Sequence, residues 1–299
     1  MSKNRHITLA LVQHPCTADR EANIASSEAA IREAARQGAE LVLLQELHAD
    51  LYFCQQESAD NFDLAEAIPG PTSEHFARLA AELDVVIVAS LFERRGAGVY
   101  HNTAVVLDRQ QGRVGQYRKM HIPDDPGFYE KYHFTPGDHT PGFEPIDTSV
   151  GRLGVLVCWD QWFPEAARLM TLAGAELLLY PTAIGWDDND AAEEQARQHD
   201  AWITVQRGHA IANGIPLAAC NRTGFEADPS EQGNGIRFWG SSFAAGPQGE
   251  MLAQGPQDAA EIILAKIDMA RTEQVRRVWP YLRDRRIDAY GDLLKRYRD

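Results

Sequence analysis

Short apolar segments alternate with helical segments through the first two thirds of the chain, and this alternation limits the fold more than any other feature. The apolar segments have the length of buried strands, for example residues 7–12 and 41–44. The stretches between them, including 19–37 and 72–83, place apolar residues at helical spacing. Such alternation is typical of α/β domains. Because the last third is richer in strands, we expect mixed sheets within a single domain over residues 1–299.

The charge balance and the apolar runs argue against two classes of partner. The chain has 29 Lys and Arg against 43 Asp and Glu, a formal net charge of −14, and such a surface repels nucleic-acid phosphates. A membrane-spanning helix needs roughly 20 apolar residues, and no run approaches that length. Residues 1–13 do not resemble a signal peptide, and the four cysteines show no CxxC spacing. We expect a cytoplasmic protein that binds neither nucleic acid nor membranes.

Three chemically reactive residues stand where expected strands end. Glu46 follows the strand at 41–44, Cys158 follows an apolar strand at 153–157, and Lys119 lies where a strand enters a proline-rich loop. Sites of α/β proteins form at the carboxyl edge of the sheet. If the fold brings these side chains together, Glu46 would take the thiol proton and Cys158 would attack a C=O or C≡N carbon. Lys119 would then stabilise the negative charge that develops.

Each of these residues also has a simpler structural interpretation. A cysteine at the end of a strand is often a small buried apolar residue, and Glu46 and Lys119 would otherwise be exposed side chains. If Cys158 lies at a strand-to-helix turn, the nearby helix amides should lower the pKa of its thiol. The combination of the three residue types favours an enzyme site over three unrelated structural roles.

At these residues the sequence resembles the nitrilase, or carbon–nitrogen hydrolase, superfamily. The motifs around Glu46, Lys119 and Cys158 match its Glu-Lys-Cys triad, and the resemblance extends from residue 7 to about residue 290. It implies a four-layer α-β-β-α sandwich and a homodimer or higher homo-oligomer. It also implies a second glutamate, Glu130, which would hold Lys119 and help to position the substrate nitrogen. Otherwise Glu130 would be a surface residue paired with Lys131.

Four stretches resemble the branch of this superfamily that hydrolyses N-carbamoylputrescine: residues 51–55, 121–131, 158–167 and 180–185. The third stretch, CWDQWFPEAA, is the most specific. The resemblance implies release of putrescine, ammonia and carbon dioxide in the route from agmatine to polyamines. The chemistry requires no cofactor, and the sequence contains no HExxH motif, so we expect no metal.

The implied substrate has a neutral ureido head and a cationic amine tail, so its pocket should supply carboxylates or aromatic faces. We expect Asp187 to bind the amine, and Tyr52 and Trp159 to form walls of the pocket. The acidic loop of Asp187 would otherwise be a solvated segment in which Asp190 caps the helix starting at residue 191. The two aromatic side chains would otherwise be ordinary core residues.

Substrate charge separates the related activities. The resemblance places arginines just behind the nucleophile in carbamoyl-D-amino acid hydrolases, whereas residues 159–162 here are Trp-Asp-Gln-Trp. A buried substrate carboxylate facing Asp160 would be costly without a partner, although Arg168 and Arg197 remain available. The alternatives are a β-ureidopropionase-like, ω-amidase-like or nitrilase activity on the same triad. A catalytically silent binding or assembly module is the non-enzyme alternative.

The C-terminal residues 271–299 differ in charge from the rest of the chain. They carry nine basic and five acidic residues. One interpretation is a solvated terminal helix. The other is an arm that docks on an acidic neighbouring subunit and is anchored by Trp279, Tyr281 and Tyr290.

Overall fold

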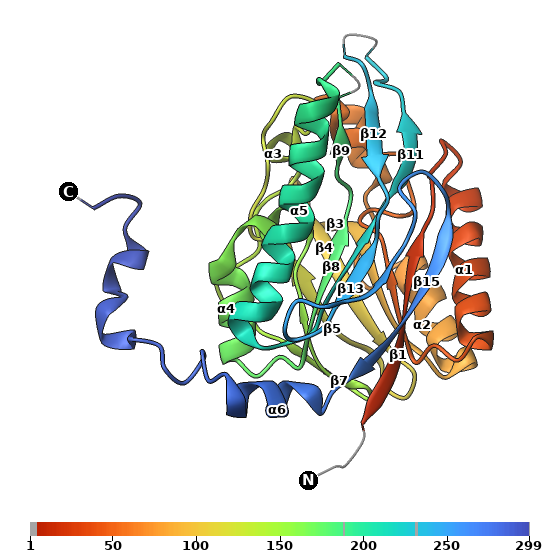
Figure 1. The fold of residues 1–299 in the computed structure, drawn as a ribbon. Coiled ribbons are helices and arrows are strands. Elements are labelled where there is room, and N and C mark those ends of the chain that lie inside the picture. The colour runs from red at the N-terminus through yellow and green to blue at the C-terminus, as the bar shows by residue number, and fades with distance from the viewer. Residues whose placement is uncertain (1–4, 188, 231–232, 299) are drawn as a thin grey trace.

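Two six-stranded sheets lie face to face with helices on the outer face of each, so the chain forms layers in the order α-β-β-α (Figure 1). This architecture is seen in a computed structural model that describes residues 5–187, 189–230 and 233–298. The α/β class, the mixed sheets and the four-layer sandwich expected from the sequence are confirmed.

The first sheet has the strand order β15-β1-β2-β3-β4-β5. Its central strands β1, β2 and β3 are parallel, whereas β15, β4 and β5 pair antiparallel with their neighbours. Helices α1 and α2 cover its outer face (Figure 1). The bounds are β1 (His6–Gln13), α1 (Arg20–Arg36), β2 (Leu41–Leu44), α2 (Pro71–Leu83), β3 (Val86–Gly96), β4 (Val99–Asp108), β5 (Gly112–Arg118) and β15 (Glu261–Asp268).

The second sheet has the order β14-β13-β10-β8-β7-β6, with β7, β8 and β10 parallel. Helices α4 and α5 cover its outer face (Figure 1). The bounds are β6 (Ile146–Thr148), β7 (Gly151–Val155), α4 (Pro164–Leu172), β8 (Leu177–Thr182), α5 (Ala192–Asn213), β10 (Leu217–Asn221), β13 (Phe243–Ala245) and β14 (Met251–Gln254). A small third sheet joins β9 (Gly185–Trp186), β11 (Thr223–Glu226) and β12 (Ile236–Trp239).

Strand β2 shows why the apolar runs are continuous. Its residues Leu41 and Leu43 belong to the core between the two sheets, whereas Val42 and Leu44 belong to the core beneath α1 and α2. Successive side chains of a strand point to opposite faces, so a strand between two apolar layers must be apolar at every position. The run ends at Gln45, where the chain leaves the sheet and enters the turn that carries Glu46.

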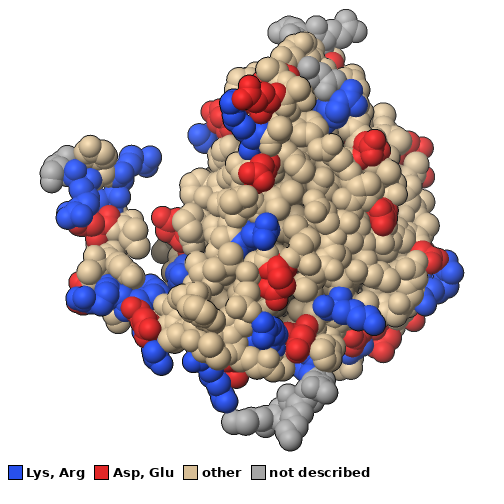
Figure 2. Space-filling view, viewed as in Figure 1, with Lys and Arg blue, Asp and Glu red and all other residues tan. Residues whose placement is uncertain are grey.

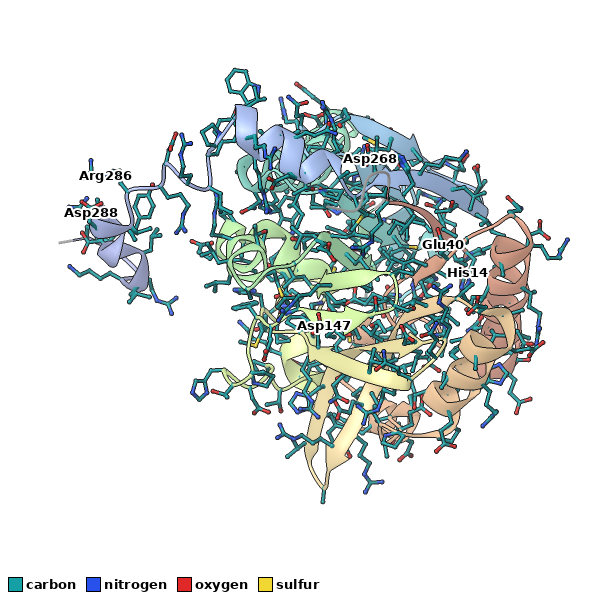
Figure 3. The ribbon with its side chains drawn as sticks, turned by 90° about the horizontal axis from the view of Figure 1, so that it is seen from below. His14, Glu40, Asp147, Asp268, Arg286 and Asp288 are labelled. Carbon is teal, nitrogen blue, oxygen red and sulfur yellow. The ribbon has the colours of Figure 1, made fainter. Side chains whose placement is uncertain are left out.

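The C-terminal segment leaves the body of the molecule. Helix α6 (Arg271–Val278) packs at the end of the sandwich, and the chain beyond it extends away, as Figures 1 and 3 show for the part that includes Arg286 and Asp288. Short 3₁₀ turns rather than a continued helix follow Val278. No helix in the described ranges combines the length and the apolar character needed to cross a membrane.

Candidate active site

Lys119 lies at the centre of a buried cluster of charges. Its Nζ is 2.8 Å from Oε1 of Glu46 and 2.7 Å from Oε2 of Glu130, and none of the three side chains is more than 1% exposed. Glu46 follows β2, Lys119 follows β5, and Glu130 begins the short helix α3 (Glu130–His133) in the long loop. The surface positions considered for these residues are therefore wrong, and Lys131 pairs instead with Asp124 at 4.0 Å.

The two carboxylates keep the lysine charged. Burial alone would lower the pKa of Lys119, but Glu130 and Glu46 raise it well above its usual value. Burial raises the pKa of Glu130 to about 7, although Lys119 and the Tyr52 hydroxyl lower it. Glu130 therefore exchanges its proton near neutral pH.

The carboxylate of Glu46 has one fixed oxygen and one free oxygen. Oε1 accepts hydrogen bonds from Lys119 and from Nδ2 of Asn102 at 2.6 Å. Asn102 is itself oriented by Ser90, whose hydroxyl donates to Oδ1 at 3.0 Å. Oε2 is buried and has no hydrogen-bond partner within the described part of the chain. This oxygen is therefore available to accept a proton.

Cys158 begins a tight turn between the second sheet and α4. It is the first residue of a 3₁₀ turn (Cys158–Trp162), and its φ of 42° lies in the left-handed region, which is uncommon for residues other than glycine. Its Sγ lies 3.8 Å from the carbonyl oxygen of Ala183 and 4.0 Å from Nε2 of Gln161. Such a conformation persists only where the surroundings fix it.

Asp160 fixes that turn through four donors. Its Oδ2 accepts hydrogen bonds from the Val157 N–H and the Tyr117 hydroxyl, both at 2.9 Å. Its Oδ1 accepts the His121 N–H at 3.1 Å and lies 2.6 Å from Nδ1 of the same histidine. Asp160 does not line the cavity at Cys158. The argument that Asp160 repels a substrate carboxylate is therefore wrong, because its carboxylate is engaged inside the protein.

The surroundings of Cys158 favour the protonated thiol. Burial raises its pKa well above the usual value, and the Glu46 carboxylate raises it further, whereas Lys119 opposes the shift. The expectation that helix amides would lower this pKa is wrong, because burial and the neighbouring carboxylate outweigh them. A thiol in this environment needs a base, and the free oxygen of Glu46 is a suitable one.

A cavity of about 510 Å³ opens at the nucleophile, and Cys158, Glu130, Trp159 and Asp187 all line it. Tyr52 is 1% exposed and lies behind Glu130, to whose Oε1 its hydroxyl donates at 2.7 Å. The structure therefore places Trp159 and Asp187 at the cavity. It places Tyr52 against Glu130 rather than on the wall.

The acidic loop forms part of the cavity wall without capping α5. The Asp187 carboxylate accepts hydrogen bonds from the Asn189 N–H at 2.9 Å and from Nδ2 of Asn234 at 3.0 Å. Asp190 also lines the cavity and accepts from Nε2 of Gln198 at 3.3 Å. The proposed capping role of Asp190 is wrong, because α5 starts one residue later and has no side-chain cap.

The two arginines considered as partners for an anionic substrate differ in position. Arg168 donates to the carbonyl oxygen of Ala212 and is not a lining residue. Arg197 lines the cavity, but its guanidinium pairs with Glu194 at 3.2 Å and with Glu193 at 2.5 Å. Its charge is therefore balanced by its own helix.

Sequence reasoning missed Asn102 and the orientation of Asp160. A signal for Asn102 is the polar run at residues 101–103, which directly precedes the apolar run 104–107 within β4. It also missed Arg222, although Arg222 follows the buried strand β10 just as Glu46 follows β2.

The arrangement is suited to amide hydrolysis by a thiol. It combines a nucleophile, a carboxylate oxygen able to accept its proton, and a buried ammonium able to stabilise an oxyanion. Across the described ranges, no group of three or more His, Cys, Asp and Glu side chains is arranged to hold a metal ion.

Known proteins share this sequence and fold. A family model described as carbon-nitrogen hydrolase matches residues 8–277. The N-carbamoylputrescine amidase of Solanum lycopersicum is 44% identical over 294 residues, which span 98% of this chain and 96% of that protein. The citrullinase of Francisella tularensis subsp. tularensis is 39% identical over 98% of this chain and 99% of its own. A solved carbon-nitrogen hydrolase from Helicobacter pylori G27 has a TM-score of 0.95 and 54% identity, covering 98% of this chain and 100% of that one.

Proposed function

The chain belongs to the carbon–nitrogen hydrolase family and is an amide-hydrolysing enzyme, and on that premise we propose that it hydrolyses N-carbamoylputrescine to putrescine, ammonia and carbon dioxide. The observation that carries the proposal is that the cavity at the Cys158 thiol has an acidic wall. Asp187 and Asp190 line the cavity, and the charge of Arg197 is balanced by neighbouring glutamates. This wall suits a cationic amine tail and disfavours an anionic one.

The proposed reaction begins with proton transfer from Cys158 to the free Oε2 of Glu46, while the sulfur attacks the ureido carbon. Lys119 and the backbone N–H of Trp159 stabilise the oxyanion. Glu46 then protonates the departing nitrogen, which leaves a carbamoyl-type thioester on the cysteine. In the second half, Glu46 removes a proton from water, whose oxygen attacks the thioester carbon. The C–S bond breaks as Glu46 returns that proton to the Cys158 sulfur, and the carbamic acid released loses carbon dioxide.

Lys119 and Glu130 support both halves of this reaction. Because Glu130 and Glu46 hold the ammonium from two sides, Lys119 can donate to the oxyanion without leaving its site. Glu130 also lines the cavity beside Cys158. We propose that it positions the substrate nitrogen there.

Ammonia release from N-carbamoylputrescine and from N-carbamoyl-β-alanine, measured side by side, tests the proposal. We expect turnover of the cationic substrate and about 5- to 30-fold lower kcat/KM for the anionic one, since a partly exposed attraction of up to about 1 kcal/mol is replaced by a repulsion of similar size. Cys158→Ala should fold and release no ammonia. Preference for the anionic substrate would contradict the acidic-pocket argument, and activity of Cys158→Ala at the wild-type rate would contradict the nucleophile.

A ureido amino acid such as citrulline is the second candidate. It carries a carboxylate beside its ammonium, and the presence of Arg197 on the cavity wall is the observation that favours it. Citrulline therefore belongs in the same assay. A kcat/KM for citrulline above that for N-carbamoylputrescine would establish the second candidate.

Asp187 is the proposed ligand of the substrate amine. Asp187→Asn should raise KM for N-carbamoylputrescine about 5-fold with little change in kcat, because a partly exposed ion pair contributes up to about 1 kcal/mol. Asp147→Asn, the same change at an exposed aspartate of β6, is the matched control. An unchanged KM in Asp187→Asn would remove this residue from the binding site.

We propose that the C-terminal segment docks on a second copy of the chain. Its apolar side chains are open to solvent in the single chain, with Tyr297 82% and Leu294 94% exposed. Lys and Arg side chains gather along this segment in Figure 2, and they complement the net negative charge of the remaining chain. Exposed apolar surface of this kind marks an interaction site.

Size-exclusion chromatography of a chain ending at Val278 tests the docking proposal. This truncation keeps α6, whose Val275 is buried against the body, so the sandwich should remain folded. We expect a smaller assembly than the full chain forms at the same concentration. An unchanged size would contradict the proposal.

All four cysteines are free thiols, in accordance with a cytoplasmic location for the proposed enzyme.

A further inference from the structure

We infer that Arg222, with its counter-ion Glu226, is a positioning residue that holds the turn carrying Glu46 in place against Cys158. Arg222 follows β10, and Glu226 ends β11. The inference rests on the proposed role of Glu46 as the base.

Arg222 donates to three carbonyl oxygens of one turn. Its Nη2 donates to the carbonyl oxygen of Glu46 at 3.1 Å and to that of Leu47 at 2.8 Å. Its Nη1 donates to the carbonyl oxygen of Asp50 at 2.9 Å. The side chain is fully buried, so these hydrogen bonds form without competition from water.

Glu226 extends this set of hydrogen bonds to the far end of the turn. Its Oε1 accepts from Nη1 of Arg222 at 2.6 Å, and its Oε2 accepts the backbone N–H of Tyr52 at 2.6 Å. Tyr52 in turn donates its hydroxyl to Glu130. The ion pair therefore fixes the backbone of the base and the backbone of the residue that orients Glu130.

The turn needs such support because it is strained. Leu47 has a φ of 48°, in the left-handed region that non-glycine residues rarely adopt. Its own backbone closes the turn with one hydrogen bond, from the Asp50 N–H to the Leu47 carbonyl at 3.2 Å. The planar guanidinium fork can hold several carbonyls in a fixed geometry, which a lysine ammonium cannot.

The ion pair of Arg222 and Glu226 also joins the two halves of the site. Glu46 follows a strand of the first sheet, whereas Cys158 and Arg222 both follow strands of the second. Arg222 therefore ties the base to the sheet that carries the nucleophile. A buried ion pair adds little net stability compared with apolar packing, so positioning is the better explanation for its presence.

Arg222→Lys and Glu226→Gln test this inference through two measurements on each variant. The first is kcat and KM for N-carbamoylputrescine, and the second is the rate of Cys158 alkylation by iodoacetamide from pH 6 to 9. Lysine keeps the charge and loses the fork. Glutamine keeps an acceptor for Arg222 and presents an N–H₂ group where the Tyr52 N–H needs an acceptor.

We expect both variants to lose about 10- to 100-fold in kcat with KM within about 3-fold, because small displacements of catalytic groups carry costs of this order. Alkylation of Cys158 near pH 7 should slow at least about 10-fold, since the base no longer assists the thiol. Arg5→Lys is the matched control. Arg5 also pairs with a glutamate and donates to a backbone carbonyl, but it precedes β1, away from the site.

A purely structural role would lower the melting temperature while leaving kcat per folded molecule and the alkylation profile unchanged, and that result overturns the inference. If Arg222→Lys does not fold, Glu226→Gln decides by the same criteria. If wild-type protein releases no ammonia from N-carbamoylputrescine, the proposed function fails. The alkylation profiles still decide the positioning role.

Discussion

Replacing Lys119 with methionine removes the ammonium that lies between the carboxylates of Glu46 and Glu130. Methionine keeps a long flexible side chain, so the change acts mainly on charge. Breaking a buried ion pair by removing one partner typically costs about 3–5 kcal/mol of unfolding free energy. Glu130 can limit this cost by retaining its proton, because its pKa is already about 7 and Lys119 is one of the groups that lower it.

The resulting destabilisation should depend on pH. The pKa of Glu130 in the folded protein is raised above its usual 4.5, so protonated Glu130 stabilises the folded state. This stabilisation is complete below about pH 4.5 and is lost as the pH rises through the folded pKa. In the wild type this loss ends near pH 7. In Lys119→Met it continues above pH 7, at about 1.4 kcal/mol per pH unit for each retained proton. The difference from wild type should therefore be at least about 1 kcal/mol larger at pH 8 than at pH 6.

Urea unfolding at pH 6, 7 and 8 and one fixed protein concentration measures this difference. The double variant Lys119→Met/Glu130→Gln is the control, since the Glu130 share of the pH dependence disappears in it. A destabilisation of equal size at pH 6 and pH 8 would refute the reasoning. The single variant Lys119→Met should also lose at least about 100-fold in kcat, which is the usual cost of removing one oxyanion donor.

Three further substitutions test individual hydrogen bonds. Tyr52→Phe removes a donor that lowers the pKa of Glu130, so the pH at which kcat responds to Glu130 should move up from about 7, and an unchanged pH–kcat profile would contradict this. Asp160→Asn leaves at least one of the donors to Asp160 unpaired, and should lower the unfolding free energy in urea by about 2–4 kcal/mol. Asn102→Ala removes a hydrogen bond to Glu46 and should lower kcat about 10-fold at constant KM. A rise in KM alone would instead assign Asn102 to substrate binding.

The alternation of strands and helices was sufficient to predict the α/β class and the mixed sheets, whereas the four layers were an implication of the family resemblance. Continuous apolar runs at residues 41–44 and 153–157 imply buried strands, and the residues that follow such strands lie at the edge of their own sheet. Glu46 and Cys158 nevertheless follow strands of different sheets, so their positions along the chain do not by themselves show that the two side chains meet.

Properties that depend on several distant groups were not accessible in this way. The pKa of the Cys158 thiol is set by complete burial and by a carboxylate more than a hundred positions away in the sequence, and a local helix rule predicts the opposite direction. The orientation of Asp160 likewise depends on Tyr117 and His121, which come from another sheet and from the long loop. Motif spacing records residue types, but it does not record which way a buried carboxylate points.

The division of the site between two sheets affects when the chain becomes reactive. The base and the lysine belong to the first sheet, the nucleophile belongs to the second, and the edge strand β15 of the first sheet is contributed by residues close to the C-terminus. During synthesis from the N-terminus, neither half alone therefore brings the thiol next to its base. The pairing of the thiol with its base is therefore a property of the assembled sandwich, because it needs both sheets in place.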